Sequence, residues 1–104
     1  MTRLVDIAGV IRSKNAGPFE LTLDVFFLDR SGWETARESG ALSADAIAAL
    51  YRVPKEDVLA VHWFAPALGW KAVIRRQVSS GTVGDRDGYG AQQHAPLLGL
   101  TLRG

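Results

Sequence analysis

The chain has 104 residues, of which 47% are hydrophobic and 22% are charged, and its formal net charge is +1. This length predicts a single domain over residues 1–104, and the ordinary balance of apolar and charged residues excludes wholesale disorder. Because Arg75-Arg76 is the longest basic run, we expect no nucleic-acid binding.

Cysteine is absent, which excludes disulfides, thiolate metal sites and cysteine nucleophiles. Charges from Arg3 to Lys14 interrupt the N-terminal segment, so it lacks the apolar core of a signal peptide. The apolar, uncharged run Val58 to Trp70 contains Pro66 and is too short for a membrane-spanning helix. We therefore expect a cytoplasmic protein without a membrane segment.

The N-terminal segment carries an apolar stripe with helical spacing, formed by Leu4, Ile7, Ala8 and Ile11. This spacing predicts a short helix that Thr2 caps and that ends near Ser13. The residues that follow resist continuation of a helix, so the segment from Arg12 to Pro18 predicts a polar loop at the helix end.

Three further elements are predicted before the middle of the chain. Residues 20–29 alternate apolar and polar side chains, which is typical of a strand. Ser31 and Glu34 form a capping-box pattern, which predicts a short helix that Gly40 ends. Ser43 is then the expected cap of a second helix.

The second half of the chain predicts strands and a long connection. Residues 58–65 are apolar apart from His62, which is typical of a central strand covered on both faces, and we expect a structural role for this histidine. Residues 70–78 alternate again and are expected to pair with that strand as an antiparallel hairpin. Alternating leucines over residues 98–102 predict a short last strand.

Individual side chains inside these elements carry two more expectations. Asp24, in the middle of its strand, is predicted to pair with Lys71 or Arg75 across the sheet. The three tryptophans are expected to be core or interface aromatics, and they are Trp33, Trp63 and Trp70.

The order of the elements predicts an α+β fold. A strand–helix–strand unit requires a right-handed crossover between parallel strands, and the hairpin and the last strand add antiparallel neighbours. We expect a four-stranded mixed sheet with helices packed on it, as a ferredoxin-like sandwich variant. A long C-terminal loop before the last strand replaces the final helix of that fold.

That loop, Ser79 to Pro96, has no helix or strand pattern and is longer than ordinary connections in a compact domain. Its glycines let the backbone approach a ligand closely and expose main-chain N–H groups. The segment Asp85 to Gly88 taken alone is more typical of a surface turn. The polar residues of the whole stretch favour a functional loop.

His94 is the leading candidate for acid–base catalysis because the ordinary pKa of histidine lies near neutrality, and a loop-bracing histidine is the competing interpretation. The candidate catalytic residues are His94, Asp85 and Asp87. The candidate ligand-binding residues come from both polar loops and are Arg12, Ser13, Lys14, Asn15, Arg86, Tyr89, Gln92 and Gln93.

Competing interpretations apply to the first loop and to metal binding. Arg12 and Lys14 are also typical of simple cations at a helix C-terminus, where the dipole repels anions. Two histidines far apart, without a carboxylate at ligand spacing, predict no metal site, and we expect no cofactor. The glycines of the long loop lack the spacing and the lysine of a nucleotide-binding loop.

The segments RSKNAGPFELTLDV (Arg12 to Val25) and GDRDGYGAQQHAPLL (Gly84 to Leu98), with VPKEDVL and FAPAL between them, resemble an uncharacterised family of small prokaryotic domains. Members of that family are encoded beside, or fused to, AtuA-type proteins, which are named for acyclic terpene utilisation. The resemblance implies a protein of unknown function that is an accessory subunit of an AtuA-type catabolic protein. It implies acyl-CoA or carboxylic-acid intermediates as the ligands. No catalytic residue of the family is established, so the resemblance assigns none to this chain.

Two other interpretations stay open. The chain is alternatively a self-sufficient lyase, isomerase or hydratase that uses His94 as acid or base. It is also compatible with a homo-oligomer that pairs through a sheet face formed by Phe26, Leu28 and Val73. A pocket that joins His94 to a carboxylate and to Lys14 or Asn15 would favour the enzyme. A flat, apolar-rimmed surface would favour an interface.

Overall fold

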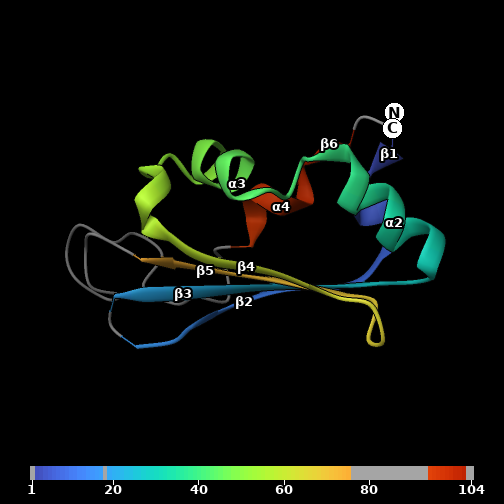
Figure 1. Cartoon of the computed structure of the whole chain (residues 1–104), viewed down its shortest axis with the longest axis horizontal. Helices are drawn as coiled ribbons and strands as arrows, with labels where there is room; N and C mark the ends of the chain where they lie inside the picture. Colours follow the sequence, from blue (N-terminus) through green and yellow to red (C-terminus); the bar gives the residue numbers. More distant parts are fainter. Residues whose placement is uncertain (1, 18, 76–93, 103–104) are drawn as a thin grey trace.

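The computed structural model describes residues 2–17, 19–75 and 94–102 (Figure 1). The elements are, in chain order, β1 (Thr2–Arg3), α1 (Leu4–Ile7), β2 (Ala8–Asn15), β3 (Glu20–Phe27), α2 (Arg30–Ser39), α3 (Ala44–Tyr51), the 3-10 helix η1 (Lys55–Asp57), β4 (Val58–Phe64), β5 (Gly69–Arg75), α4 (Ala95–Leu98) and β6 (Thr101–Leu102). Helices α2, α3 and α4 lie on one face of the main sheet, and no described helix lies on the other face (Figure 1). The predicted α+β class is confirmed.

The main sheet has four strands in the order β2-β3-β5-β4, and every neighbouring pair is antiparallel. The prediction of a mixed sheet is therefore wrong. Strands β3 and β4 do run in the same direction, as their helical connection requires, but β5 lies between them and pairs with both. The ferredoxin-like arrangement is not confirmed. The place beside β3 belongs to the N-terminal strand β2, and the predicted C-terminal strand is not part of this sheet.

The predicted N-terminal helix is restricted to Leu4–Ile7, and the rest of its stripe belongs to β2. A bulge between Ala8 and Val10 explains the misleading spacing. Ala8 lies opposite Phe27 and Ile11 lies opposite Val25, so both face the helices although they are three residues apart. An extra residue in a strand thus imitates the spacing of a helix face.

The C-terminal residues also differ from the prediction. Leu98 ends the short helix α4, and only Thr101–Leu102 is a strand. This strand pairs with β1 in a separate two-stranded sheet. The chain ends that the structure describes therefore meet beside the helices and outside the main sheet (Figure 1).

The ends of α2 and α3 follow local capping chemistry. Asp29 caps α2, because its carboxylate accepts a hydrogen bond of 2.8 Å from the N–H of Gly32. The predicted capping box of Ser31 and Glu34 is therefore wrong, and the carboxylate of Glu34 pairs with Arg30 instead. Gly40 ends α2 in the left-handed region (φ 76°), and Ser43 accepts from the N–H of Ala46 to cap α3. Both of these predictions are confirmed.

Replacing the cap of α2 tests this assignment. Asp29→Ala is expected to lower the free energy of unfolding by about 1 kcal/mol, because the N–H of Gly32 loses its acceptor. Urea denaturation followed by circular dichroism measures the change. Ser31→Ala is the matched control and is expected to change stability by less than about 0.5 kcal/mol, since Ser31 is exposed. An effect of Ser31→Ala as large as that of Asp29→Ala would contradict this assignment and support Ser31 as the cap.

The hydrophobic core lies between the sheet and the helices, and Trp70 is fully buried within it. The indole N–H of Trp70 donates to the carbonyl of Leu42 at 3.2 Å, and that of Trp33 donates to the carbonyl of Gly69 at 3.0 Å. Trp63 packs edge-on against Trp33, with 5.8 Å between ring centroids. The prediction of core tryptophans is confirmed. In the described part of the chain, no helix is long and apolar enough to cross a membrane.

Candidate functional site

The predicted polar loop from Arg12 to Pro18 is mainly strand, because β2 continues to Asn15. Only the turn after Asn15 remains, where the N–H of Ala16 donates to the carbonyl of Glu20 and Gly17 takes a φ of 113°. The interpretation of Arg12 and Lys14 as helix-end cations is therefore wrong, since no helix ends there.

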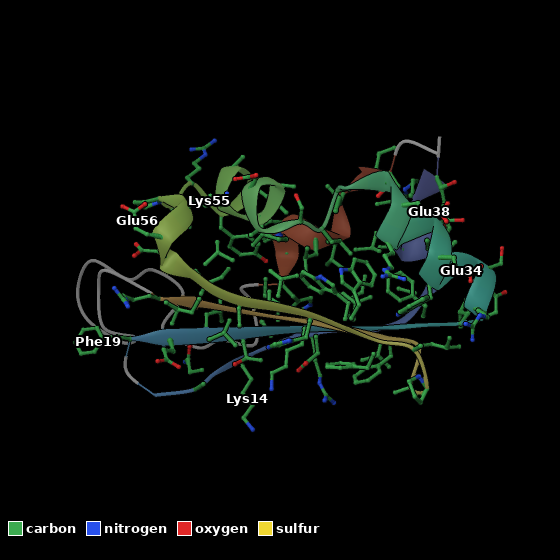
Figure 2. All side chains as sticks on the ribbon, in the orientation of Figure 1. Lys14, Phe19, Glu34, Glu38, Lys55 and Glu56 are labelled. Atoms are coloured by element: carbon green, nitrogen blue, oxygen red, sulfur yellow. The ribbon has the colours of Figure 1, made fainter. Side chains whose placement is uncertain are left out.

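The alternation of β2 divides the four polar residues of that segment between the two faces of the sheet. Ser13 lies opposite the core residue Leu23, so it faces the helices, and Asn15 follows it on the same face. Arg12 and Lys14 face the other way, and Figure 2 shows Lys14 pointing away from the helices. The four residues therefore do not form one clamp.

His94 meets Ser13 on the helix-covered face. It is half-buried at the N-terminal end of α4, and its Nδ1 lies 3.5 Å from the hydroxyl oxygen of Ser13. Pro96 follows in the first turn of α4, where the missing N–H of proline costs no hydrogen bond. The structure thus joins one residue of each predicted polar loop.

The other predicted residues of the long loop are Asp85, Asp87, Arg86, Tyr89, Gln92 and Gln93, and they lie outside the described residues. The pairing of His94 with an aspartate therefore stays a prediction. Within the described ranges, no ion pair joins His94 to a carboxylate, and no group of three His, Asp or Glu side chains gathers at metal-binding distance. Burial raises the pKa of the Tyr51 hydroxyl above its ordinary value.

The face of the sheet that carries no described helix shows an arrangement that the sequence did not reveal. One residue from each strand forms a row across all four strands, which we call the charged row, and its members are Arg12, Asp24, Lys71 and His62. The guanidinium Nε of Arg12 lies 3.3 Å from the Oδ2 of Asp24. The cation in contact with Asp24 is therefore Arg12. Of the two predicted partners, Lys71 lies directly opposite Asp24 on β5 without an ion pair, and Arg75 lies opposite Glu20 instead.

The charged row also corrects the prediction for β4. Among the described strands this one lies at the edge of the sheet, and His62 is exposed on the face that carries no described helix. Coverage of both faces by helices therefore does not explain why residues 58–65 are apolar. Trp63 packs into the core, whereas Phe64 lies on the opposite face.

A second row of side chains lies next to the charged row. We call it the apolar band, and its members are Val10, Phe26, Phe64 and Leu28, which follows β3 and whose side chain lies beside Gly9. Val10 is 43% exposed and Leu28 is 66% exposed, while the two phenylalanines are half-buried. The sequence had indicated Phe26 and Leu28 as part of a sheet face available for association.

Two glycines let the apolar band lie close to the backbone. A Cβ on Gly69 would stand 2.7 Å from Phe64 and 3.1 Å from Phe26, so the two rings meet over Gly69. A Cβ on Gly9 would stand 3.1 Å from the side chain of Leu28. Because glycine has no side chain, the members of the apolar band pack close to the backbone at these two positions and form a shallow apolar surface on the sheet.

Comparison with known proteins adds a family to this description. The family model described as "Domain of unknown function (DUF4387)" matches residues 4–101. No curated protein and no solved structure shows a significant match. The predicted resemblance to a domain of unknown function is confirmed, and its association with AtuA-type proteins stays a prediction. Since the match covers nearly the whole sequence, the chain belongs to the family of domains of unknown function DUF4387.

Proposed function

We propose that this domain is a protein-binding accessory subunit that docks on a larger partner through the face of its sheet that carries no described helix. The apolar band supports the proposal, because it leaves Leu28 66% exposed and Val10 43% exposed beside two aromatic rings. Apolar surface that is grouped in this way, with charged side chains at its border, is typical of interaction sites.

The apolar band has no role in the core that would explain it. The core packs on the opposite face of the sheet, and its members include neither Phe26 nor Phe64. An antiparallel sheet with one solvated face normally places polar side chains on that face. Interaction with another protein is a function that supplies a physical reason for two phenylalanines there.

An AtuA-type catabolic protein is the partner to test first, because of the resemblance described above. In that assembly the domain completes or covers the active site of its partner, which acts on acyl-CoA or carboxylic-acid intermediates. A small carboxylate or acyl-CoA is then the ligand of the complex.

Co-purification of the tagged chain with an AtuA-type protein tests this function. A stable complex is expected with the wild-type chain, and Leu28→Ser and Phe64→Ala are each expected to weaken it by about thirtyfold, as residues near the centre of an interface do. Phe19→Ala is the matched control. Phe19 is 51% exposed and directly precedes β3, at the opposite end of that strand from Leu28 (Figure 2). Failure of the wild-type chain to form a complex would reject the AtuA-type partner, and equal losses for all three variants would reject the docking face.

A second candidate function is a lyase, isomerase or hydratase that uses His94 as acid or base. The contact between Nδ1 of His94 and the hydroxyl of Ser13 supports it, since a second polar group that orients the imidazole is a common feature of acid–base sites. The reaction rate of the AtuA-type protein, measured alone, with the wild-type chain and with His94→Ala, tests whether His94 takes part in that reaction. An unchanged rate in both comparisons would remove any catalytic role of this chain in the reaction of the AtuA-type protein.

A further inference from the structure

We infer that the sheet face recognises an acidic segment of its partner protein, which places an apolar side chain on the apolar band and carboxylates beside Lys14 and Lys71. This inference rests on the proposed function and names the chemistry of the partner. It follows from the balance of charge on the face and from the position of the charged row next to the apolar band.

The carboxylates of the face itself are already matched by cations. Asp24 pairs with Arg12 at 3.3 Å, and Glu20 lies directly opposite Arg75 in the pairing of β3 with β5. Lys71 also lies directly opposite Asp24, so two cations flank that one carboxylate. Among the described residues, neither Lys14 nor Lys71 forms an ion pair, and the cations of this face outnumber its carboxylates. The described part of the face therefore has an excess of positive charge that a partner can neutralise.

The same charges argue against a second copy of the chain as the occupant. Two copies stacked face to face would bring two surfaces with an excess of positive charge together, which like-charge repulsion disfavours. The helical side carries charges of both signs, since Glu34 pairs with Arg30 and Lys55 pairs with Asp45. The excess of positive charge on the sheet face therefore favours an acidic protein as its partner.

The spacing of the sheet defines the segment that fits. Lys14 lies opposite Thr22 and Lys71 lies opposite Asp24, on the two strands that flank β3. Two strand spacings of about 4.8 Å and an offset of two residues therefore separate their backbones by about 12 Å. The apolar band is two residues farther along the strands than the charged row, which is about 7 Å. Lys14 lies a further two residues beyond the charged row, on the same side of the apolar band as Lys71. A short segment with one large apolar side chain and carboxylates to one side of it therefore reaches the apolar band and both lysines.

Basic and aromatic side chains on a sheet also occur in proteins that bind single-stranded nucleic acid. Here the guanidinium of Arg12 lies 5.4 Å from the ring centroid of Phe26 and covers that ring. Val10 and Leu28 are the most exposed members of the apolar band, and aliphatic side chains offer no surface for base stacking. These observations favour a protein segment.

Nuclear magnetic resonance of the isotope-labelled full chain tests the inference without the partner. The probes are the peptides Glu-Glu-Trp-Glu-Glu and Lys-Lys-Trp-Lys-Lys and a short oligothymidylate. The acidic peptide is expected to shift amide signals in β2, β3 and β5, and the basic peptide is expected to leave them unchanged. Lys71→Glu and Lys14→Glu are expected to weaken the acidic peptide about tenfold each. Lys55→Glu, a control on the helical side (Figure 2), is expected to leave the affinity unchanged.

Every other result overturns the inference. Absence of shifts, equal shifts with both peptides, or tighter binding of the oligothymidylate would each do so, the last in favour of nucleic acid. Dimerisation of the chain through these strands would identify a second copy as the occupant. A complex with the AtuA-type protein that persists unchanged in Lys71→Glu and at about 1 M salt, where charges are screened within about 3 Å, would overturn the inference and leave the proposed function standing. Signal shifts with the acidic peptide, together with no complex with the AtuA-type protein, would support the inference and reject the AtuA-type partner.

Discussion

Trp70→Ala is expected to lower the free energy of unfolding by about 3–5 kcal/mol, because it removes the largest fully buried side chain of the core. The loss combines the apolar surface returned to water with the cavity that remains between the sheet and α3. It also leaves the carbonyl of Leu42 without the indole N–H that donates to it. Small domains are stable by about 5–15 kcal/mol, so this one change removes a large share of the total.

Urea denaturation of Trp70→Ala, Trp70→Phe and Trp63→Ala separates these contributions. Trp70→Phe keeps most of the apolar volume and loses the hydrogen bond to Leu42, so its expected cost is about 1–3 kcal/mol. Trp63 is only half-buried on the edge strand β4, and its replacement is expected to cost less than that of Trp70. A cost for Trp70→Ala below that of Trp63→Ala would contradict the central position of Trp70.

Gly69→Ala is expected to lower the free energy of unfolding by about 1–3 kcal/mol, although it adds only one methyl group on the surface of the sheet. That methyl group would stand 2.7 Å from Phe64, and the ring of Phe26 closes the other side at 3.1 Å. The backbone has little freedom to move away, because the carbonyl of Gly69 accepts the indole N–H of Trp33. The rings must therefore rotate out, which also disturbs the apolar band.

A double-mutant cycle with Phe64→Ala measures this coupling. Removal of the ring makes room for the new methyl group, so Gly69→Ala is expected to cost at least about 1 kcal/mol less in the Phe64→Ala background. Gly99→Ala is the matched control, because a Cβ at Gly99 meets nothing within 4 Å and its φ of −92° suits any residue. Additive costs in the cycle would show that Gly69 and Phe64 do not touch.

The sequence by itself determined the elements whose signals are local. The alternation over residues 20–29 predicted β3, because one of its faces packs on the core. Gly40 and Ser43 set the adjoining ends of α2 and α3, since a left-handed turn and a side-chain acceptor depend only on neighbouring residues. The tryptophans were predicted as core residues from their size alone.

The tertiary structure decided the pairing of strands and the surface that pairing creates. The bulge of β2 imitates a helix stripe, and only its pairing with β3 distinguishes the two. The apolar run of β4 has the composition of a central strand, but β5 takes the place beside β3 and leaves β4 at the edge. Neither the bulge in β2 nor the edge position of β4 can be predicted from a local sequence pattern.

The candidate site shows the same division. His94 could be predicted from the sequence as a titrating residue, but its contact with Ser13, which lies far away in the sequence, depends on how α4 packs over the sheet. Alternation in β2 then separates Ser13 from Lys14, which the sequence had placed in one cluster. The charged row joins residues 12, 24, 62 and 71 because four strands pair in one register. Side-chain types are therefore determined by the sequence, whereas their grouping into a surface is determined by long-range pairing.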